Sequence, residues 1–511
     1  MLPGSGVRRR APGVSVSEGM QKLSSVVNDS ARRYRRLPFF AKVIFCLSLL
    51  FSFGIYLLFF RSFIKHDIAD DNFLEVGMCP ACLGSSACGL MYHNQVQFTG
   101  WGNHRLGDVF STKNVRYATL YGSQSVVLKK MGSESEIQEL DKKVCADANR
   151  PEGCDVARVL FLTDTFVKLR KAGALLPKHL QQTVGMFTCA SYRLLDRMWS
   201  FYKELRKVKK IMIGDQLQVW YTASLNPEPL MLQTFPASER WPFPEYFGAC
   251  GRHAMIEHVG RTLEDFYHEP FHKRAGVAYE LLTIADHLTN NEEDFALYIT
   301  DPNWENFGVD ASGKVRILDA ENIIVVDKLA IEAKKPADYD KFIQSDNGRC
   351  EDNACLSMLP EELCTHLHSD HNYYAICHSL LDPLMKDSVM PGGLLHDMPE
   401  EAKDYWDLEH LLKECSQPSK YKGRVFAKDK LLTALAKLHD ESNEHLASPP
   451  KPDKRGLPPP LKRKKELWEY EDYDDGVVND AKEVDDKKNE KDNGKDIEFE
   501  EEKGKGAVVL E

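Results

Sequence analysis

The sequence predicts an α+β domain that follows a single membrane-spanning helix. An apolar run from Val43 to Phe60 carries no charge and is just long enough to cross a bilayer as a helix. Beyond it, short alternating segments typical of strands occur together with longer segments of helical period. A group of polar residues on one predicted hairpin then shows where chemistry is to be sought.

Composition divides the chain into five segments. Residues 1–36 are basic and without apolar periodicity, so we expect a disordered cytosolic tail. Residues 37–60 form the expected transmembrane signal-anchor, 61–78 a short stalk, and 79–445 the folded domain. Residues 446–511 are Pro-rich, then basic, then acidic, and predict a disordered charged tail.

Charges around the span predict its orientation. Arginine and lysine are concentrated before it, whereas acidic residues follow it, so the amino terminus is expected in the cytosol and the domain in the lumen or outside the cell. A cleaved signal peptide fits poorly, because about forty residues precede the apolar run. The net charge of −11 gives no sign of a nucleic-acid partner.

Cysteine usage agrees with that orientation. Of the 13 cysteines, all except Cys46 lie beyond the span, which predicts several disulfides in an oxidising compartment, with a pairing that the sequence does not reveal. Cys79-Pro80-Ala81-Cys82 also fits a redox or zinc motif. The disulfide interpretation is favoured because there is no second CxxC and no surrounding strand-helix-strand pattern.

Three polar residues flank the predicted hairpin at defined intervals. Residues 307–309 and 315–318 read as strands around a turn at 310–313, with Asp301 and Asn306 before the hairpin and Asp319 after it. Capping and turn formation would explain any one of these residues alone. All three together match the spacing of a protein-kinase catalytic core, in which an Asp is the base and an Asn and a second Asp hold metal ions.

An upstream lysine fits the same interpretation. Residues 115–120 and 125–129 predict a second hairpin, and its last residue, Lys129, is the candidate phosphate contact, with Lys130 as the alternative. In the helix that follows, Glu136 is the candidate partner of Lys129, with Glu139 next. Ser133 and Glu136 also form a capping box, which would use that glutamate in structure alone.

Other segments carry weaker expectations. Gly100, Gly102 and Gly107 offer only a loose glycine-rich loop, and residues 229–236 read as a strand leading to a connection between lobes. Apolar residues between 277 and 288 recur at helical spacing and predict a buried helix that leads to the candidate base. Asp370 opens a later helix and could brace the catalytic loop. Three histidines nearby suggest a metal site without paired spacing: His366, His368 and His371.

With these residues in place, the sequence resembles the divergent protein kinase domain family, close to its deleted-in-autism protein branch. The resemblance runs from about Cys79 to Cys415 and rests on eight blocks: 79–82, 126–129, 226–230, 241–243 with 248–252, 288–291, 301–306, 319–322 and 370–377. Family members resemble secretory-pathway kinases. Two departures stand out, because Thr300 replaces the arginine that usually precedes the base and Asp319-Ala320-Glu321 replaces Asp-Phe-Gly.

The resemblance implies a bilobal protein-kinase-like fold with its amino-terminal lobe ending near residue 235. It implies a kinase that moves the γ-phosphoryl group of ATP to a protein or glycan hydroxyl, using Mg²⁺ or Mn²⁺. Asp301 would be the base, Asn306 and Asp319 the metal ligands, and Lys129 and Glu136 the nucleotide contacts. The alternative is a pseudokinase that acts as a signalling or trafficking adaptor. We expect a single-pass type II membrane protein of the Golgi or endoplasmic reticulum. Its domain could also be secreted after cleavage. The expected partner is a protein substrate or receptor.

Overall fold

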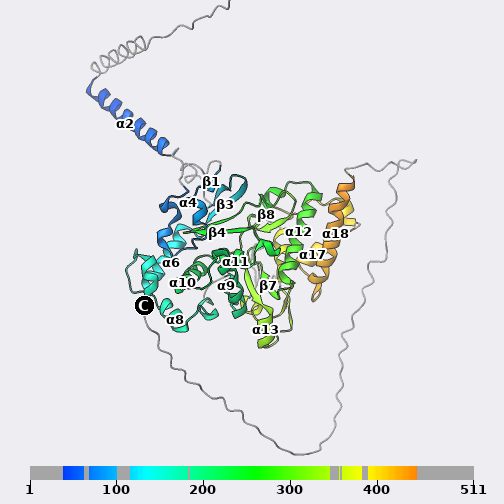
Figure 1. Cartoon of the computed structure of the whole chain (residues 1–511). Helices are drawn as coiled ribbons and strands as arrows, with labels where there is room; N and C mark the ends of the chain where they lie inside the picture. The colour runs from blue at the N-terminus through cyan, green and yellow to red at the C-terminus, as the bar shows by residue number, and fades with distance from the viewer. Residues whose placement is uncertain are drawn as a thin grey trace, which may run out of the picture. The chain divides into compact units, whose positions relative to one another are not determined.

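The computed structural model describes residues 38–62, 68–99, 115–181, 185–345, 356, 359–382, 390–404 and 406–445. Both expected disordered tails, the loose glycine-rich loop, Cys350 and Cys355 lie outside these residues. The content is mixed α/β, as the sequence predicts. In Figure 1 the strands β1, β3 and β4 lie together, and the helices α12, α17 and α18 pack side by side.

A five-stranded antiparallel sheet forms the first part of the domain. Its strand order is β1-β2-β3-β5-β4, and its strands are β1 (Val96–Phe98), β2 (Val115–Leu120), β3 (Gln124–Lys130), β4 (Tyr246–Cys250) and β5 (His253–Glu257). The predicted hairpin of residues 115–129 is therefore present. The sheet ends at Glu257, so its last two strands lie beyond the lobe boundary that we expected near residue 235.

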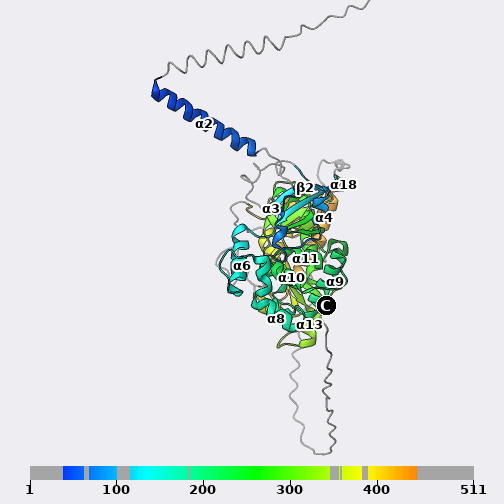
Figure 2. The ribbon, with the colours of Figure 1, turned by 60° about the vertical axis from the view of Figure 1, so that its left-hand side comes forward.

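Between β3 and β4 the chain makes a series of helices, which Figure 2 shows gathered beside the sheet. The α-helices are α6 (Glu134–Asp147), α7 (Val156–Val159), α8 (Asp164–Ala172), α9 (Tyr192–Arg206), α10 (Ile213–Leu225) and α11 (Glu228–Thr234), with 3₁₀ turns at Leu160–Leu162, Pro177–His179, Gly185–Phe187 and Ala237–Glu239. Helix α11 corrects the expected strand over 229–236. A continuous apolar run does not distinguish a buried strand from a buried helix, and α11 is buried throughout.

The second part of the domain combines small sheets with longer helices. Its strands are β6 (Arg261–Thr262), β7 (Phe295–Tyr298), β8 (Phe307–Val309), β9 (Val315–Ile317), β10 (Ile324–Asp327), β11 (Phe342–Ile343) and β12 (His368–Ser369). Its α-helices are α12 (Phe271–Thr289), α13 (Lys328–Lys334), α14 (Pro360–Leu363), α15 (His371–Ile376), α16 (Glu400–Asp404), α17 (Leu408–Ser416) and α18 (Gly423–His445), with 3₁₀ turns at Leu263–Phe266 and Trp304–Asn306 and a π turn at Cys377–Leu381. The predicted helix over 277–288 and hairpin over 307–318 are both confirmed.

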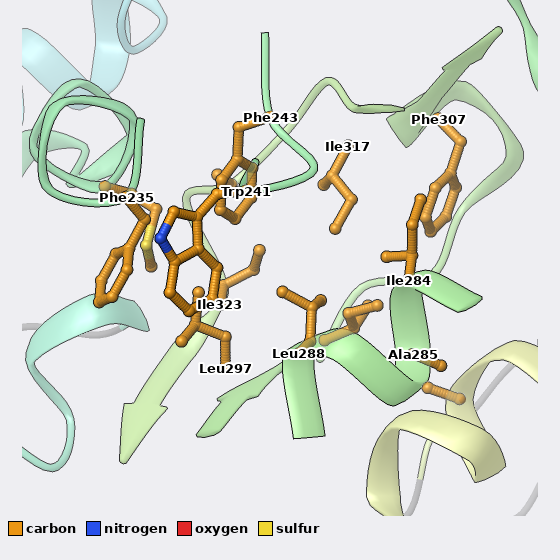
Figure 3. Packing of buried hydrophobic residues seen from close by; sticks show 14 of the residues in the cluster. Phe235, Trp241, Phe243, Ile284, Ala285, Leu288, Leu297, Phe307, Ile317 and Ile323 are labelled. Atoms are coloured by element: carbon orange, nitrogen blue, oxygen red, sulfur yellow. The ribbon is translucent and has the colours of Figure 1, made fainter. Parts of the chain in front are cut away.

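One apolar cluster joins the predicted hairpin to the helices on both sides of it. Figure 3 shows Trp241 and Phe243, which follow α11, packed near Leu288 of α12, Leu297 of β7 and Ile317 of β9. All five side chains are buried. Because burial of each large apolar side chain contributes about 1.5–3 kcal/mol, this cluster fixes the hairpin relative to α11 and α12.

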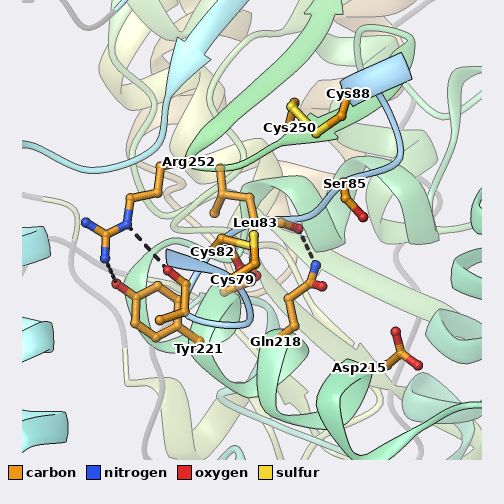
Figure 4. The surroundings of a disulfide bond; sticks show 12 residues. Cys79, Cys82, Leu83, Ser85, Cys88, Asp215, Gln218, Tyr221, Cys250 and Arg252 are labelled. Carbon is orange, nitrogen blue, oxygen red and sulfur yellow. Dashed lines mark hydrogen bonds between the residues drawn. A yellow bond between two sulfur atoms is a disulfide. The ribbon is translucent and has the colours of Figure 1, made fainter. Parts of the chain in front are cut away.

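Disulfides hold the irregular segments, as the sequence predicts. The five bonds among the described residues are Cys79–Cys82, Cys88–Cys250, Cys145–Cys154, Cys189–Cys364 and Cys377–Cys415. The CxxC cysteines are therefore bonded to each other (Figure 4). In the same figure Gln218 of α10 donates to the Leu83 carbonyl, and the two atoms are 2.7 Å apart. This bond ties the cysteine-rich segment at the start of the domain to α10.

The folded domain begins earlier than expected. Residues 68–78, predicted as part of a stalk, form the short helix α3 (Asp71–Leu74) and a 3₁₀ turn at Val76–Met78; helix α4 (Cys88–Tyr92) follows them. Ile68 and Leu74 are buried in the same cluster as strand residues Val96 and Leu128. The segment packs on the sheet because its apolar residues cover that face.

Helix α2 (Phe39–Ser62) contains the apolar run. It is the one helix among the described residues that is long and apolar enough to cross a membrane by length and composition, with a mean hydropathy of 2.0 over Phe39–Tyr56. A core helix or a signal sequence can satisfy the same criterion. None of that window is buried by the rest of the described chain.

The buried ion pair between Arg424 and Asp370 gives a stability prediction. Their nitrogen and oxygen lie 2.6 Å apart, and both side chains are almost fully buried. We expect Arg424→Met to lower the free energy of unfolding by about 3–5 kcal/mol, because it leaves a buried carboxylate unpaired. Thermal unfolding of the purified protein measures this. Arg158→Met, at an exposed pair, should change little, and equal shifts in both variants would contradict the expectation.

Candidate functional site

Lys129, at the end of β3, lies between two carboxyl groups. Its Nζ is 2.5 Å from Glu228 Oε2 and 3.8 Å from Asp319 Oδ1. The neighbouring Lys130 points elsewhere and pairs with Glu75 at 2.8 Å and Glu134 at 3.2 Å. Lys129, rather than the alternative Lys130, is therefore the lysine that meets Asp319, the residue that follows the predicted hairpin.

The glutamate that pairs with Lys129 is Glu228, and the expectation for Glu136 is wrong. Glu136 accepts hydrogen bonds from the backbone nitrogen of Ser133 at 2.6 Å and from its hydroxyl at 2.8 Å, which completes the capping box of α6. Glu139, the second choice, pairs with Lys143 on the same helix. The capping role that the sequence also allowed for Glu136 is the one present.

Glu228 is positioned by the start of α11. Asn226 accepts a hydrogen bond from the Glu228 backbone nitrogen at 2.9 Å and donates its own amide to Glu321. Pro229 fits there because the first turn of a helix leaves its nitrogen without a partner in any case. At the other end, Arg197 of α9 donates to the Thr234 carbonyl at 3.0 Å. Both ends of this short helix are thus held by side chains.

The sequence contained a signal for Glu228. A single carboxylate stands directly before a continuous apolar segment, in Asn226-Pro227-Glu228-Pro229, and its side chain is fully buried. Buried glutamates are rare unless they are paired. The expectation of a strand over 229–236 gave this glutamate no role. Lys129 and Glu228 are 99 residues apart, whereas the expected partner, Glu136, lies in the helix directly after Lys129.

Asp301 and Asn306 lie on one loop before β8. The Asn306 amide donates to the Asp301 carbonyl at 3.0 Å and to its carboxylate at 3.1 Å. The Asn303 amide donates to the other carboxylate oxygen of Asp301. The backbone nitrogen of Leu318 donates to the Asn306 carbonyl at 2.7 Å, so the chain that carries Asp319 runs beside Asn306. The hairpin therefore brings these three predicted residues together.

Helix α15 holds the strand that leads into this loop. Asn372 accepts from the Ile299 nitrogen and donates to the Leu297 carbonyl, both at 2.9 Å. His371 Nε2 lies 3.0 Å from the Ile299 carbonyl and donates to it in the neutral tautomer. Asp370, the expected brace, instead accepts from the Ser345 nitrogen and from Arg424. The bracing groups are thus the two residues after the predicted one.

Burial controls the charge of the site. Burial and the repulsion of Asp319 raise the pKa of Glu228, whereas the attraction of Lys129 lowers it and favours the charged form. Burial also raises the pKa of Glu321, beside Asp319. Burial alone would lower the pKa of Lys129, but the charges of Glu228 and Asp319 outweigh it and the pKa is raised. Three carboxyl groups therefore share one ammonium, and the site attracts cations.

The side chains of the site suit a cation that is bound partly by the protein and partly by the phosphate groups of a ligand. Within the described residues no group of three His, Cys, Asp or Glu side chains forms a metal cage, which also removes the suggested site at His366, His368 and His371. Glu228 Oε1 is buried without a hydrogen-bond partner among those residues. Mg²⁺ is commonly bound by one or two carboxylates with phosphate oxygens completing its shell. Asp319 and Asn306, whose backbone segments meet through the Leu318–Asn306 hydrogen bond, are the residues that could supply the protein ligands.

Comparison with known proteins decides the family. The chain is 40% identical over 425 residues to divergent protein kinase domain 2A of Xenopus tropicalis, covering 80% of this chain and 98% of that protein. The chain belongs to the divergent protein kinase domain family. A family model described as the protein-kinase domain of FAM69 matches residues 219–418. Human divergent protein kinase domain 2A is 39% identical, covering 74% of this chain and 90% of that protein, and human divergent protein kinase domain 2B is 29% identical, covering 67% and 78%.

The stretch that the family model matches includes most residues of the candidate site. Asp301, Asn306, Asp319 and Glu228 fall inside the stretch that the family model matches, whereas Lys129 precedes it. The alignment with the Xenopus relative covers four-fifths of the chain, so the similarity extends well outside that stretch.

His371 gives a pH prediction for the loop. Burial lowers its pKa from 6.5 to about 4, so the folded state binds this proton less tightly than the unfolded chain does. The free energy of unfolding should therefore fall as pH drops from 6.5 toward 4, by about 1.4 kcal/mol per pH unit at most. His371→Gln should lack this component. Denaturant unfolding of both proteins across that range checks it, and parallel pH profiles would contradict it.

Proposed function

We propose that this protein is a metal-dependent kinase that transfers the γ-phosphoryl group of ATP to a hydroxyl group of a protein. The observation that carries the proposal is the placement of Lys129 between Glu228 and Asp319, on a chain whose Asp301 and Asn306 share one loop. Phosphoryl transfer depends on positioning and charge stabilisation more than on covalent chemistry. The five-stranded sheet would form one lobe and the part from α12 to α18 the other.

The residues have distinct roles in this proposal. Lys129 contacts the α- and β-phosphates, and Glu228 holds that ammonium in place. Asn306 and Asp319 hold Mg²⁺ or Mn²⁺, which supplies charge neutralisation for the phosphates when bound. Glu136 is bound in the capping box and does not pair with Lys129, so Glu228 takes the role expected for it.

Asp301 serves as the base. The amides of Asn303 and Asn306 fix both of its carboxylate oxygens, so the group is oriented before a substrate arrives. It accepts the proton of the substrate hydroxyl while that oxygen forms a bond to the γ-phosphorus and the bond to ADP breaks. A glycan hydroxyl could be used by the same chemistry, although a protein is the acceptor that the family name suggests.

Thr300 supports an active site that needs no loop phosphorylation. In place of an arginine that would await a phosphate, its hydroxyl donates to the Asn322 carbonyl at 2.6 Å. The loop before Asp301 is thereby tied directly to the segment after Asp319. Loop ordering in this protein comes from a neutral hydrogen bond rather than from an added charge.

The apolar helix and the disulfides support a location in the secretory pathway. An apolar helix near the amino terminus and five disulfides after it suit a type II protein of the endoplasmic reticulum or Golgi with a luminal domain. Secretion after cleavage would deliver the same domain outside the cell. In either location millimolar divalent cations and ATP would have to be available to the site.

One observation favours the alternative of a pseudokinase adaptor. Glu321 adds a carboxyl group beside Asp319 and Glu228, and three acidic groups around one lysine repel a triphosphate unless a cation neutralises them. A protein that never binds ATP would show no metal-dependent nucleotide effect. Nucleotide binding therefore separates the two functions.

We expect ATP with Mg²⁺ or Mn²⁺ to raise the melting temperature of the purified protein by several degrees, because ligand binding to the folded state stabilises it. Asp319→Asn should lose this shift through the missing cation ligand. Asp301→Asn should keep the shift and lower phosphate transfer by at least 100-fold, since only the base is removed. A flat response to ATP and either metal in the wild-type protein would support the adaptor.

Glu228 and Glu136 form a matched pair for the second test. Glu228→Gln should weaken metal–ATP binding by about tenfold or more, because Lys129 loses its charged partner. Glu136→Gln should leave that affinity within about twofold while costing a few tenths of a kcal/mol of stability at the cap. Nucleotide titration followed by intrinsic fluorescence measures both. A larger loss in the Glu136 variant would overturn the assignment.

A further inference from the structure

We propose a second anion site, for a phosphate group, in a pocket that shares no residue with the candidate active site. The pocket has a volume of about 350 Å³. It lies between the end of α12, the start of α13, the paired strands β11 and β12, and the segment before α18, and its polar lining includes Thr289, Lys328, Asp340, His368, Ser369 and Lys422. Its size falls in the range of small-ligand pockets.

The first lysine is held in the pocket without a carboxylate. Lys328 Nζ donates to the carbonyl of Thr289, the last residue of α12, at 2.6 Å. Among the described residues no Asp or Glu oxygen lies within the 4.0 Å of an ion pair with it. Burial lowers the pKa of Lys328, with only partial compensation from the more distant Asp294. Its charge is thus left to be neutralised by something else.

The second lysine comes from a different part of the chain. Lys422 Nζ lies over the rings of Phe342 at 5.5 Å and Tyr421 at 5.6 Å, and within the described part of the chain it makes no ion pair. Two elements far apart in sequence therefore bring ammonium groups to one cavity. Asp340 is the single carboxylate of the lining, so the pocket keeps an excess of positive charge.

His368, in the lining of the same pocket, lies close enough to Lys328 and Lys422 for both charges to affect its pKa. Burial is the largest cause that lowers its pKa, the charges of Lys328 and Lys422 lower it further, and Asp340 opposes them in part. The neutral imidazole can still donate one hydrogen bond. Ser369 adds a hydroxyl, which accepts from the His371 nitrogen at 3.2 Å and whose proton has no acceptor among the described residues. Two cations and two neutral donors match the acceptor oxygens of a phosphate group.

The ligand is a phosphate group in one of two forms. A phosphorylated side chain of a protein and free inorganic phosphate present the same oxygens and charge. A phosphorylated side chain would add contacts along the pocket wall, where Phe342, Leu367 and Val425 supply apolar surface. The proposal goes beyond the kinase function, because it requires neither ATP nor Asp301.

Isothermal titration of the full chain tests the site, with inorganic phosphate and a phosphoserine peptide as separate probes. We expect saturable binding to the wild-type protein, weakened at least tenfold by Lys422→Gln. This residue is exposed and its ammonium makes no hydrogen bond among the described residues, so the variant should fold. Lys328→Met should have a similar or larger effect, and Lys334→Gln, exposed at the end of the same helix α13, should have none.

The outcomes separate the ligand forms and the two sites. Tighter binding of the phosphoserine peptide identifies a phosphoprotein ligand, and equal binding identifies the free anion; both support the pocket. Lys129→Met should remove metal–ATP binding and keep the phosphate binding, so a failure of one proposal leaves the other measurable. Absence of saturable binding by both probes, or unchanged binding in Lys422→Gln and Lys328→Met, overturns the site.

Discussion

The ion pair between Lys129 and Glu228 is the constraint on which the rest of the site depends. It joins a strand to a helix 99 residues later, and the chain between them must return to within hydrogen-bond distance. A buried charge pair is stable only when its geometry is kept, because each desolvated group costs several kcal/mol without its partner. The helices α6 to α10 between the two residues therefore act as the frame that keeps α11 against the sheet.

That frame is fixed by charged and covalent links at several points. Arg252, next to β5, is buried and donates to Tyr221 of α10 (Figure 4). It also donates to Asp141 of α6 and to the Ala81 carbonyl. Arg197 of α9 reaches the end of α11. Cys189–Cys364 connects the same region to the second part of the domain. A helix tied in this way cannot swing outward without breaking several links, so Glu228 stays beside Lys129.

The elements that could be predicted from the sequence are those whose structure depends on residues close together in the chain. Both hairpins, the buried helix before Asp301, the capping box at Ser133 and the use of cysteines in disulfides follow from spacing and residue type within short windows. The role of Glu228 could not be predicted in this way, because its partner lies 99 residues away and their contact depends on how the intervening helices pack. The apolar segment of α11 was also ambiguous, since a helix buried on every side loses the 3.6-residue period. Residues 68–78 were expected to be a stalk, but Ile68 and Leu74 are buried against the sheet, which is a long-range contact that the local pattern does not show.

The segment after Asp319 limits how this protein can be controlled. Only Ala320 to Ile323 separate Asp319 from β10, and α13 follows β10 at once. Asp327, at that junction, is buried and accepts from Ser191 at 2.7 Å and from Arg193 of α9 at 2.8 Å. Between Asp319 and β10 the described chain therefore has no long loop of the kind that phosphorylation orders in other proteins. In the proposed kinase function, the bound cation and nucleotide would have to offset the excess of carboxyl groups, and the substrate hydroxyl would have to reach Asp301. Because α11 is fixed as well, regulation in that function would act on what enters the site rather than on the shape of the site.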